Sequence, residues 1–559
     1  MAAAALLFGL VIAAYFPTFF SGYIWDDDLY LTQNPAITQP GGLGRIWLSA
    51  DCPQYYPLVF TTFWVEHHFW GLAPAGYHLV NVALHATNAL LLAGLLARLG
   101  VRGTWLAAAI FAVHPVHVES VAWITERKNV LSLCFYLLAF RSFLRFEDEG
   151  SSGSYFAALV LFAAALLSKT ITCSLPVALF LVRWARGRPF TRRWLMLLVP
   201  FVIVGLGMAS VTVWYEHHRV GAVGAEFDLS LAQRIILAGR ALWFYAEKLI
   251  WPANLTFIYP RWSLDASSIL AYIAPASALL VLLILLHARR RIGRWPFVAI
   301  AFFALTLVPA LGFISVFPMR YSFVADHFQY IASIGFIALL AGVALRTTQY
   351  LPLAIRAGWL PKAIAGLGLC VLALFTWMQT FSYADEETLW RDTLARNPQA
   401  WIAHVNLGVL LHRQGDYPAA LECQRRATQI NPEAHEAWAA LGAALEKLDR
   451  PDEAIAAYER AVSVAPRFAR AHFALAEELA RQSRWPQAIQ HYRIALQLKP
   501  DDVRTIIRLV ETLTVSGNPE AALAFGQREL ERLRGRPAIS RSDLDRLDST
   551  LQRLRAGAE

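Results

Sequence analysis

Three consecutive carboxylates near the N-terminus are the first side chains in the chain that could do chemistry: Asp26, Asp27 and Asp28. Adjacent carboxylates can raise one another's pKa, so Asp26 or Asp27 could act as a general base that deprotonates an acceptor hydroxyl. The triplet could instead bind a divalent cation, or form only the solvated acidic edge of a loop. We therefore predict catalytic carboxylates at Asp26 and Asp27, and we leave open a metal site formed by the triplet.

A second group of ionisable side chains lies between His114 and Asn129, flanked by apolar runs. Ionisable groups at membrane depth are costly unless they line a wet cavity, so we interpret this group as substrate-binding. The spacing of His114 and His117 offers no third metal ligand at helical spacing. An alternative is that Pro115 breaks a helix and the imidazoles bond the exposed carbonyls. The candidates in this segment are His114, His117, Glu119, Arg127 and Lys128.

Two later positions add cations and further polar groups. Lys169 follows an apolar run, and Arg320, Asp326 and His327 lie in a loop that precedes another run. A guanidinium can bind phosphate oxygens bidentately, so Arg320 is a candidate phosphate partner. The alternative is that Lys169 and Arg320 only reach toward membrane headgroups. A hydroxyl acceptor and an anionic, lipid-linked donor would need such carboxylates, imidazoles and cations together, and we predict that all these residues share one substrate site.

The elements that must position these groups are mainly apolar. Of the 559 residues, 57% are hydrophobic and 16% charged, against about 45–50% and about 25% in soluble domains. This composition excludes a disordered chain, a disulfide scaffold and a single soluble domain, and indicates a polytopic membrane protein of about 11 spans. The predicted spans are residues 2–20, 78–99, 104–116, 129–146, 153–168, 171–185, 194–215, 266–287, 295–316, 327–345 and 363–381. The charged and aromatic stretch 231–251 is predicted to lie at the outer interface.

The distribution of charge predicts an orientation. Residues 1–384 hold 26 Lys and Arg against 16 Asp and Glu, whereas residues 385–559 hold 24 against 25. The positive excess gathers in loops such as 183–193 and 289–294, which is typical of cytoplasmic loops and need not indicate nucleic-acid binding. The N-terminus is then cytoplasmic, and the candidate site and C-terminal region face the periplasm, or the lumen of the endoplasmic reticulum in a eukaryote.

The C-terminal region is a repeat with a period of 34 residues. Proline recurs at this interval, and so do leucine and alanine: Pro398, Pro432, Pro466 and Pro500; Leu407, Leu441, Leu475 and Leu509; Ala420, Ala454, Ala488 and Ala522. This is the tetratricopeptide (TPR) pattern of paired helices. We predict an all-α fold with a transmembrane helical domain (1–384), a TPR α-solenoid (385–530, with units 397–430, 431–464, 465–498 and 499–530) and a capping helix (531–559). The concave TPR face is expected to bind an acceptor protein or peptide.

Several short motifs, in order along nearly the whole chain, resemble the transmembrane and TPR-containing O-mannosyltransferase family, whose members are glycosyltransferases of the GT-C fold. The motifs are YIWDDD (23–28), YYPL (55–58), YHLVNVALH (77–85), HPVHVE (114–119), LSK (167–169), VPA (308–310) and VADHFQY (324–330). The resemblance implies a catalytic acidic pair at Asp26 and Asp27. It further implies inverting transfer of mannose or another hexose from a polyprenyl-phosphate carrier, dolichyl phosphate in eukaryotes, to a protein Ser or Thr hydroxyl.

The chain departs from the family at His327, where the last outer motif usually has an arginine. A neutral imidazole would neutralise a donor phosphate less well, so that role would pass to Arg320, Arg127 or Lys169. Two other functions remain as alternatives. A non-enzymatic membrane-anchored TPR scaffold for envelope proteins explains the repeats but not the ionisable groups. A transporter of lipid-linked glycans would often contain inverted repeats, of which the sequence shows none. Beyond the lipid-phosphate sugar donor and the open divalent cation, no cofactor is expected.

Overall fold

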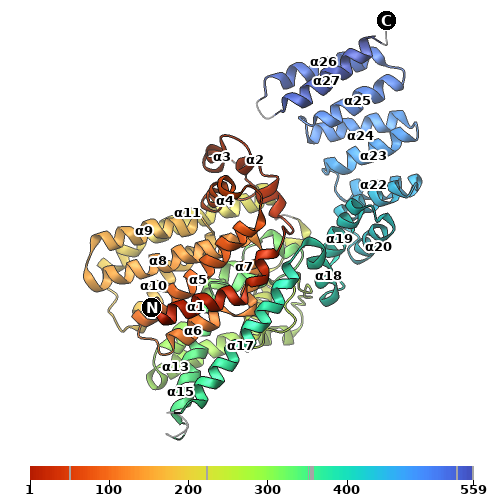
Figure 1. The fold of residues 1–559 in the computed structure, drawn as a ribbon. Coiled ribbons are helices and arrows are strands. Elements are labelled where there is room, and N and C mark those ends of the chain that lie inside the picture. The colour runs from red at the N-terminus through yellow and green to blue at the C-terminus, as the bar shows by residue number, and fades with distance from the viewer. Residues whose placement is uncertain (50–51, 222–223, 351, 353–357, 537–538, 557–559) are drawn as a thin grey trace. The chain divides into compact units, whose positions relative to one another are not determined.

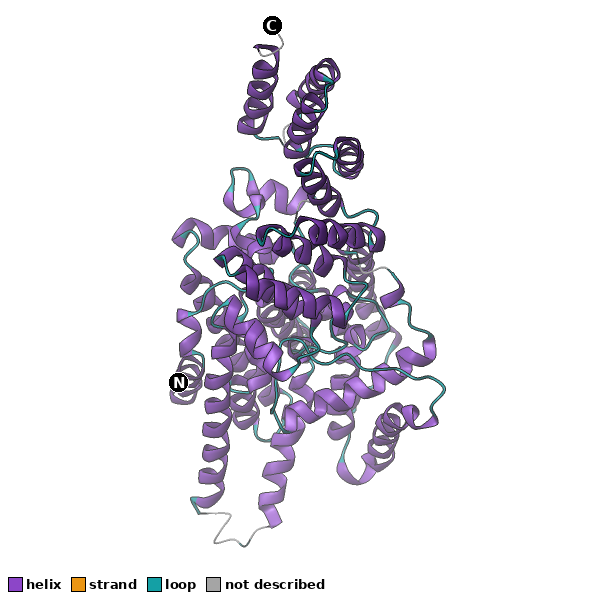
Figure 2. Ribbon diagram, turned by 90° about the vertical axis from the view of Figure 1, so that its right-hand side faces the viewer, coloured by secondary structure: helices purple, strands orange, loops and turns teal. Residues whose placement is uncertain are grey.

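The computed structural model describes residues 1–49, 52–221, 224–350, 352, 358–536 and 539–556. Over these residues it contains helices and loops but no strand (Figure 2), which confirms the predicted all-α class. The chain divides into two compact units, Met1–Asn397 and Pro398–Glu559.

The first unit is a bundle of apolar helices. Among the described residues, five helical segments are long and apolar enough to cross a membrane: Pro74–Arg98, Ile124–Glu149, Arg192–Val220, Ile269–Ile292 and Leu360–Tyr383. Shorter apolar helices are Ala2–Ala14, Ser152–Leu166, Thr170–Ala185 and Trp295–Ala310. One further candidate is a pair, Thr104–Ala112 and Pro115–Ala122, bent by 54°. The predicted span 104–116 breaks here because Pro115 has no N–H to donate to a helical hydrogen bond.

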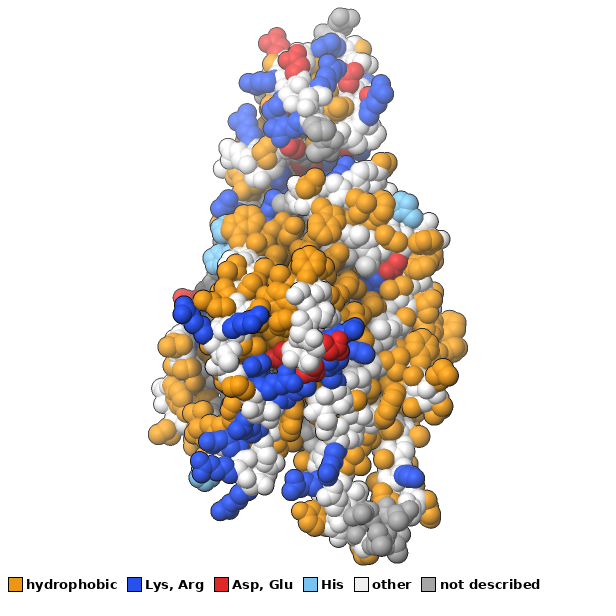
Figure 3. Space-filling model, turned by 90° about the vertical axis from the view of Figure 1, so that its left-hand side faces the viewer, with side chains coloured by type: hydrophobic (Ala, Val, Ile, Leu, Met, Phe, Trp, Pro, Cys, Tyr) orange, Lys and Arg blue, Asp and Glu red, His pale blue; other side chains and the backbone are white. Residues whose placement is uncertain are grey.

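Many connections between the apolar helices gather at two ends of the bundle. Helix α8 (Arg127–Glu149) lies beside α9 (Ser152–Leu166) and also packs on α5 (Pro74–Arg98) (Figure 1). Figure 3 looks onto the side where α8 and α9 join, and shows Lys and Arg side chains gathered around a few acidic ones. The ion pairs at this end join Arg98, Arg183, Arg186 and Arg188 to Glu147 and Asp148. The predicted basic loops therefore lie together, at one end of the bundle.

Small helices pack against the segment that carries the acidic triplet. They are α2 (Pro35–Thr38), α3 (Gly42–Leu48) and α4 (Pro57–Trp70). Their apolar side chains, which include Phe60 and Phe63 of α4, form one buried cluster with Tyr30 and Tyr77. A Cβ atom at Gly42 would clash with the carbonyl oxygen of Ala36, so this close approach requires glycine. The cluster fixes the loop after Asp28 against the start of α5.

Helix α12 (Leu231–Ile250) covers the stretch predicted to lie at an interface. It begins with a capping box formed by Ser230 and Gln233, and it packs on α13 (Ile273–Ile292). Its charged side chains bond to nearby loops: Lys248 Nζ donates to the carbonyl of Ala253 at 2.8 Å, and the guanidinium of Arg240 lies over the ring of Trp262. Lys248 and Arg240 of α12 thus contact loop residues. The location of α12 at the membrane interface remains a prediction.

Helix α18 (Glu386–Arg396) belongs to the first unit. The Trp390 ring is fully buried, with its centroid 4.7 Å from Trp25 and 5.6 Å from Phe257. The Asn397 amide donates to the carbonyl of Ile258 at 3.1 Å. The structural boundary therefore falls after Asn397, later than the predicted boundary at 384, because the side chains of α18 pack into the helical bundle.

The second unit consists of antiparallel helix pairs, each within one predicted repeat. The pairs are α19 and α20 (Trp401–Gln414, Tyr417–Ile430), α21 and α22 (His435–Lys447, Pro451–Val464), α23 and α24 (Ala469–Arg481, Trp485–Leu498), and α25 and α26 (Val503–Val515, Pro519–Arg534). The periodic alanines Ala420, Ala454, Ala488 and Ala522 are fully buried. Helix α27 (Arg541–Ala556) packs on α25 and α26 through Leu547 and Leu551, as a capping helix does.

Candidate active site

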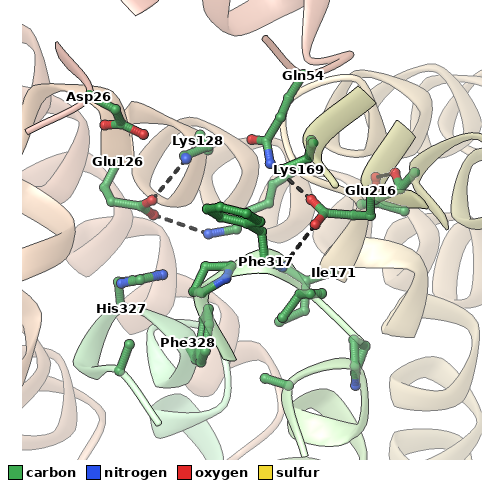
Figure 4. A pocket seen from close by; sticks show the side chains of 18 of the residues that line it. Asp26, Gln54, Glu126, Lys128, Lys169, Ile171, Glu216, Phe317, His327 and Phe328 are labelled. Atoms are coloured by element: carbon green, nitrogen blue, oxygen red, sulfur yellow. Dashed lines mark hydrogen bonds and ion pairs between the residues drawn. The ribbon is translucent and has the colours of Figure 1, made fainter. Parts of the chain in front are cut away.

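A cavity of about 530 Å³ lies at the end of the bundle opposite the basic loops. Its walls come from the connections before α5, between α6 (Thr104–Ala112) and α8, after α9, after α11 (Arg192–Tyr215) and after α14 (Trp295–Leu307). Five of the predicted site residues line it: Asp26, Glu119, Lys128, Lys169 and His327. Figure 4 shows Asp26, Lys128, Lys169 and His327 around the cavity. The alternating helices thus bring together segments that are up to 301 residues apart.

Asp26 presents an unpaired carboxylate to this cavity. Its Oδ1 atom is buried and has no hydrogen-bond partner among the described residues. Burial raises the pKa of the Asp26 carboxyl to about 7, although the nearby Lys128 ammonium opposes the shift. The preceding residue, Trp25, has a φ of +49°, a left-handed conformation that is costly for a bulky side chain and must be held by its surroundings. A carboxylate that titrates near neutral pH in a cavity can accept a hydroxyl proton.

Asp27 lies behind the cavity wall and has a different environment. Its Oδ1 accepts hydrogen bonds from the N–H of Thr125, at 2.9 Å, and from the Thr125 hydroxyl. Its Oδ2 accepts from the N–H of Ile24 at 3.0 Å. Both oxygens are therefore occupied by hydrogen bonds that join the acidic loop to the segment before α8. The geometry places Asp26, and not Asp27, where a substrate could reach it.

The acidic triplet does not converge on one point. Asp28 Oδ1 accepts from the Thr32 hydroxyl at 2.7 Å, while Asp27 bonds Thr125. Within the described ranges, no group of three or more His, Cys, Asp or Glu side chains is placed to hold a metal ion. The residues at Asp26, Asp27 and Asp28 thus do not fit the metal site that the sequence left open.

Two ammonium groups share one carboxylate on the wall beside Asp26. Glu126 Oε1 lies 3.0 Å from Lys128 Nζ, and Glu126 Oε2 lies 3.0 Å from Lys169 Nζ. Asn129 supports the cluster: it donates to Glu126 Oε2 at 2.6 Å and accepts from Lys169 Nζ at 2.8 Å. With two cations and one anion the cluster is positive, which suits a phosphate group. Glu126 and Asn129 were not among the predicted site residues, although both lie in the segment singled out.

His327 and Glu119 form a second polar pair in the cavity. Glu119 Oε1 lies 2.8 Å from His327 Nδ1, and Glu119 Oε2 accepts from the backbone N–H of His327 at 3.0 Å. An ionised carboxylate only accepts hydrogen bonds, so Nδ1 carries the proton in this arrangement. Figure 4 shows the His327 imidazole near Glu126, with its ring pointing into the cavity. Glu119 therefore orients the imidazole, and the Nε2 edge remains for a ligand.

The two predicted arginines and Asp326 do not line the cavity. Arg127 is fully buried and donates to Glu66, Asn81 and the carbonyl of Tyr77. Arg320 pairs with Glu226 at 2.9 Å, and Asp326 accepts from the Tyr259 hydroxyl at 3.0 Å. These side chains hold the surrounding loops together. The cations that line the cavity are Lys128, Lys169 and Arg219, among the residues that the structure describes.

The imidazoles of His114 and His117 also lie outside the cavity. His114 Nε2 lies 3.1 Å from the carbonyl of Leu249, and His117 Nδ1 lies 2.8 Å from that of Phe111. His117 Nε2 bonds the Ser333 hydroxyl at 3.0 Å. The alternative interpretation of this motif, in which imidazoles satisfy carbonyls at a helix break, describes their contacts. These contacts hold the segment around the helix break, which carries Glu119.

Three residues that the sequence did not indicate close one side of the cavity. Glu216, at the end of α11, accepts from the Gln54 amide at 3.0 Å and from the Phe317 N–H at 3.1 Å. Figure 4 shows the Phe317 ring within the cavity, between this pair and the lysines. The signal available in the sequence was Glu216 itself, an ionisable residue directly after the apolar run 194–215.

Comparison with known proteins shows similarity to TPR family models and to named relatives. Tetratricopeptide repeat family models match residues 398–467 and 439–503. Protein O-mannosyl-transferase Tmtc1 of Drosophila melanogaster is 30% identical over 275 residues, which cover 45% of this chain and 31% of the relative. Human protein O-mannosyl-transferase TMTC1 is 32% identical over 191 residues, covering 31% and 22%.

Solved structures of TPR proteins are also similar to part of the chain. The crystal structure of MamA protein is 20% identical with a TM-score of 0.26, and covers 29% of this chain and 87% of that one. A thermophilic TPR protein of Thermus thermophilus, TTC0263, is 24% identical with a TM-score of 0.26, covering 34% and 96%.

The similarity to the TMTC proteins confirms the resemblance that the short motifs predicted. The chain spans less than a third of the length of these relatives. They are named protein O-mannosyl-transferases, and this name supports a glycosyltransferase role for their relative.

Proposed function

We propose that the chain is an integral-membrane glycosyltransferase that transfers mannose or another hexose from a polyprenyl-phosphate carrier to a Ser or Thr hydroxyl of a protein. The observation that carries the proposal is the unpaired Asp26 carboxylate, which lies in one cavity with the Lys128–Glu126–Lys169 cluster. A base beside a cationic wall is what hydroxyl attack and phosphate departure require. The named activity of the TMTC relatives supports the same reaction.

In this reaction the Asp26 carboxylate takes the proton of the acceptor hydroxyl while the hydroxyl oxygen attacks the anomeric carbon. The bond from that carbon to the phosphate oxygen breaks, and the lipid phosphate leaves with the electron pair. Lys128 and Lys169 stabilise the negative charge that develops on the phosphate. Attack opposite the leaving group inverts the anomeric configuration, and the general base contributes about 10²–10⁴-fold to the rate.

The apolar side of the cavity suits the hydrocarbon part of such a donor. Ile171, Val213 and Ile314 line it, next to the lysine cluster. An isoprenoid chain could lie along these side chains while its phosphate reaches Lys128 and Lys169. Burial of the chain would supply binding energy at about 25 cal/mol per Å² of apolar surface.

The basic loops and the TPR unit support an orientation and a partner for this reaction. Because basic loops favour the cytoplasm, the cavity at the opposite end of the bundle would face the periplasm or lumen. The TPR unit, whose repeats generally bind proteins or peptides on a concave surface, would recruit the acceptor there. Transfer would then occur where unfolded or secreted acceptors are exposed.

The direct experiment incubates the purified full-length chain with polyprenyl-phosphate mannose, with and without a Ser/Thr-containing peptide. We expect release of polyprenyl phosphate and a mass gain of one hexose on the peptide, both unchanged by EDTA. Peptide binding without any release would favour the scaffold alternative. Movement of the intact donor across a vesicle membrane, again without release, would favour the transporter.

A further inference from the structure

A second cavity, of about 610 Å³, lies at the other end of the helical bundle. It is lined by the end of α5, the start of α14 and one side of α15 (Ser333–Thr347) along its length. The first cavity is lined by the segment after α14 and by the loop before α15, and the two cavities share no lining residue. The second cavity is therefore separate from the proposed catalytic site and lies on the side of the basic loops.

The wall of this cavity is mainly apolar and includes two arginines, which come from two segments in contact. Arg102 and Arg346 both line it. A Cβ atom on Gly103 would lie 2.7 Å from Leu345 Cδ1 and 3.4 Å from the carbonyl oxygen of Ala341, so the loop that carries Arg102 packs directly on the last turns of α15. The exposed arginines form no hydrogen bond or ion pair with any residue that the structure describes. Two unpaired positive charges on segments that pack together favour the binding of an anion.

We propose that this cavity binds one anionic phospholipid, with its phosphate at Arg102 and Arg346 and an acyl chain among the apolar side chains. A free phosphate ion would leave the apolar wall empty, and a zwitterionic lipid would bring no net charge to the two arginines. Trp295 lines the same cavity at the start of α14, and tryptophan favours the level of the lipid headgroups. Basic pockets between membrane helices on the cytoplasmic side are established sites for anionic headgroups.

Small residues on α15 provide the room for the acyl chain. Ala338 and Gly342 lie about one turn apart on the helix and line the cavity. No atom lies within 4 Å of the position that a Cβ atom on Gly342 would take, so this glycine faces open space. The cavity volume falls within the range of about 300–1,000 Å³ that is usual for small-molecule sites. A larger side chain at 342 should therefore fill the cavity without disturbing the helix.

The test uses the full-length chain in nanodiscs that contain equal amounts of phosphatidylglycerol and phosphatidylcholine. Lipid that remains bound after mild delipidation is identified by native mass spectrometry. We expect one retained phosphatidylglycerol per chain. The double variant R102Q/R346Q should bind it about 25-fold more weakly, since each basic side chain near an anionic lipid contributes about fivefold. R290Q/R291Q, which removes two exposed arginines from the end of α13, is the matched control and should bind normally.

A second variant tests the apolar part of the proposal independently. Gly342→Leu keeps both arginines but fills the cavity, and should also lose the retained lipid. Equal retention of phosphatidylcholine, or undiminished phosphatidylglycerol in R102Q/R346Q, would overturn the proposal. Retention in Gly342→Leu, or displacement of the lipid by inorganic phosphate at millimolar concentration, would show that the arginines bind only a surface anion and would overturn it equally.

Discussion

The carboxylate of Asp27 accepts hydrogen bonds from the backbone N–H of Thr125, at 2.9 Å, and from the Thr125 hydroxyl, across 98 residues of sequence. This contact fixes the acidic loop to the segment that begins α8 and carries Lys128. It also uses the lone pairs that Asp27 would need as a base. The neighbouring Asp26 remains unpaired in the cavity, so two adjacent carboxylates have separate roles: Asp27 positions the loop, and Asp26 is the proposed base.

Asp27→Asn should therefore act mainly through stability. The amide cannot accept hydrogen bonds from Ile24 and Thr125 on both of its atoms, and a buried unsatisfied donor costs about 1–3 kcal/mol. We expect a lower thermal midpoint, measured by intrinsic fluorescence of the detergent-solubilised chain. Transfer should fall in proportion to the folded fraction and recover on cooling. Complete loss of transfer at an unchanged midpoint would assign the base to Asp27 instead.

The rate of transfer should rise with pH through neutrality. Burial raises the pKa of Asp26 to about 7, and a general base acts only when it is deprotonated. Half of the carboxyl is protonated at that pKa, and each pH unit below it lowers the active fraction about tenfold. The measurement is the initial rate of lipid-phosphate release between pH 5 and 9 at saturating donor. A profile that is flat or that falls across this range contradicts the assignment.

Lys169→Met should slow catalysis because the departing phosphate loses a stabilising charge. The ammonium lies 3.0 Å from Glu126 and faces the cavity, where it would stabilise the departing phosphate. Loss of one such charge typically lowers kcat by about 10²–10³-fold. Arg320→Gln is the informative comparison, since Arg320 pairs with Glu226 away from the cavity. Its kcat should change far less than that of Lys169→Met, and the reverse order would restore Arg320 as the phosphate partner.

Trp390→Ala tests whether α18 holds the catalytic loop. The Trp390 ring packs on Trp25, whose φ of +49° requires support from its neighbours. The substitution should lower stability by about 3–5 kcal/mol. It should also admit water near Asp26, which would shift the rise of the pH–rate profile below pH 7. Trp438→Ala, at a half-exposed tryptophan of the TPR unit, is the control and should leave that profile unchanged.

Most of the architecture could be predicted from local patterns. Apolar runs of helical length located the long apolar helices of the bundle but not α2, α3 and α4, and the 34-residue period located the TPR helix pairs. Alternating helix directions then explain why Asp26, Glu119, Lys128, Lys169 and His327 line one cavity. These five residues are far apart in the sequence, yet each follows or precedes an apolar run at the same end of the bundle.

What could not be predicted depends on contacts between distant residues. Nothing local distinguishes Asp26 from Asp27, because the difference is the hydrogen bond to Thr125. Arg127 carries the same charge as Lys128. Its guanidinium, however, bonds Glu66 of α4, which is 61 residues away, and therefore does not reach the cavity. The division into compact units after Asn397 could not be predicted for the same reason. The sequence of α18 does not reveal that Trp390 packs on Trp25.

The substitution Asp26→Asn in the full-length chain tests the central claim most directly. The measurement is release of polyprenyl phosphate from polyprenyl-phosphate mannose in a single turnover, together with the thermal midpoint of the variant. The account predicts that release falls by about 10²–10⁴-fold, the contribution of a general base, while the midpoint does not fall. Release within a few-fold of the unaltered chain, from a variant that is equally stable, would contradict it.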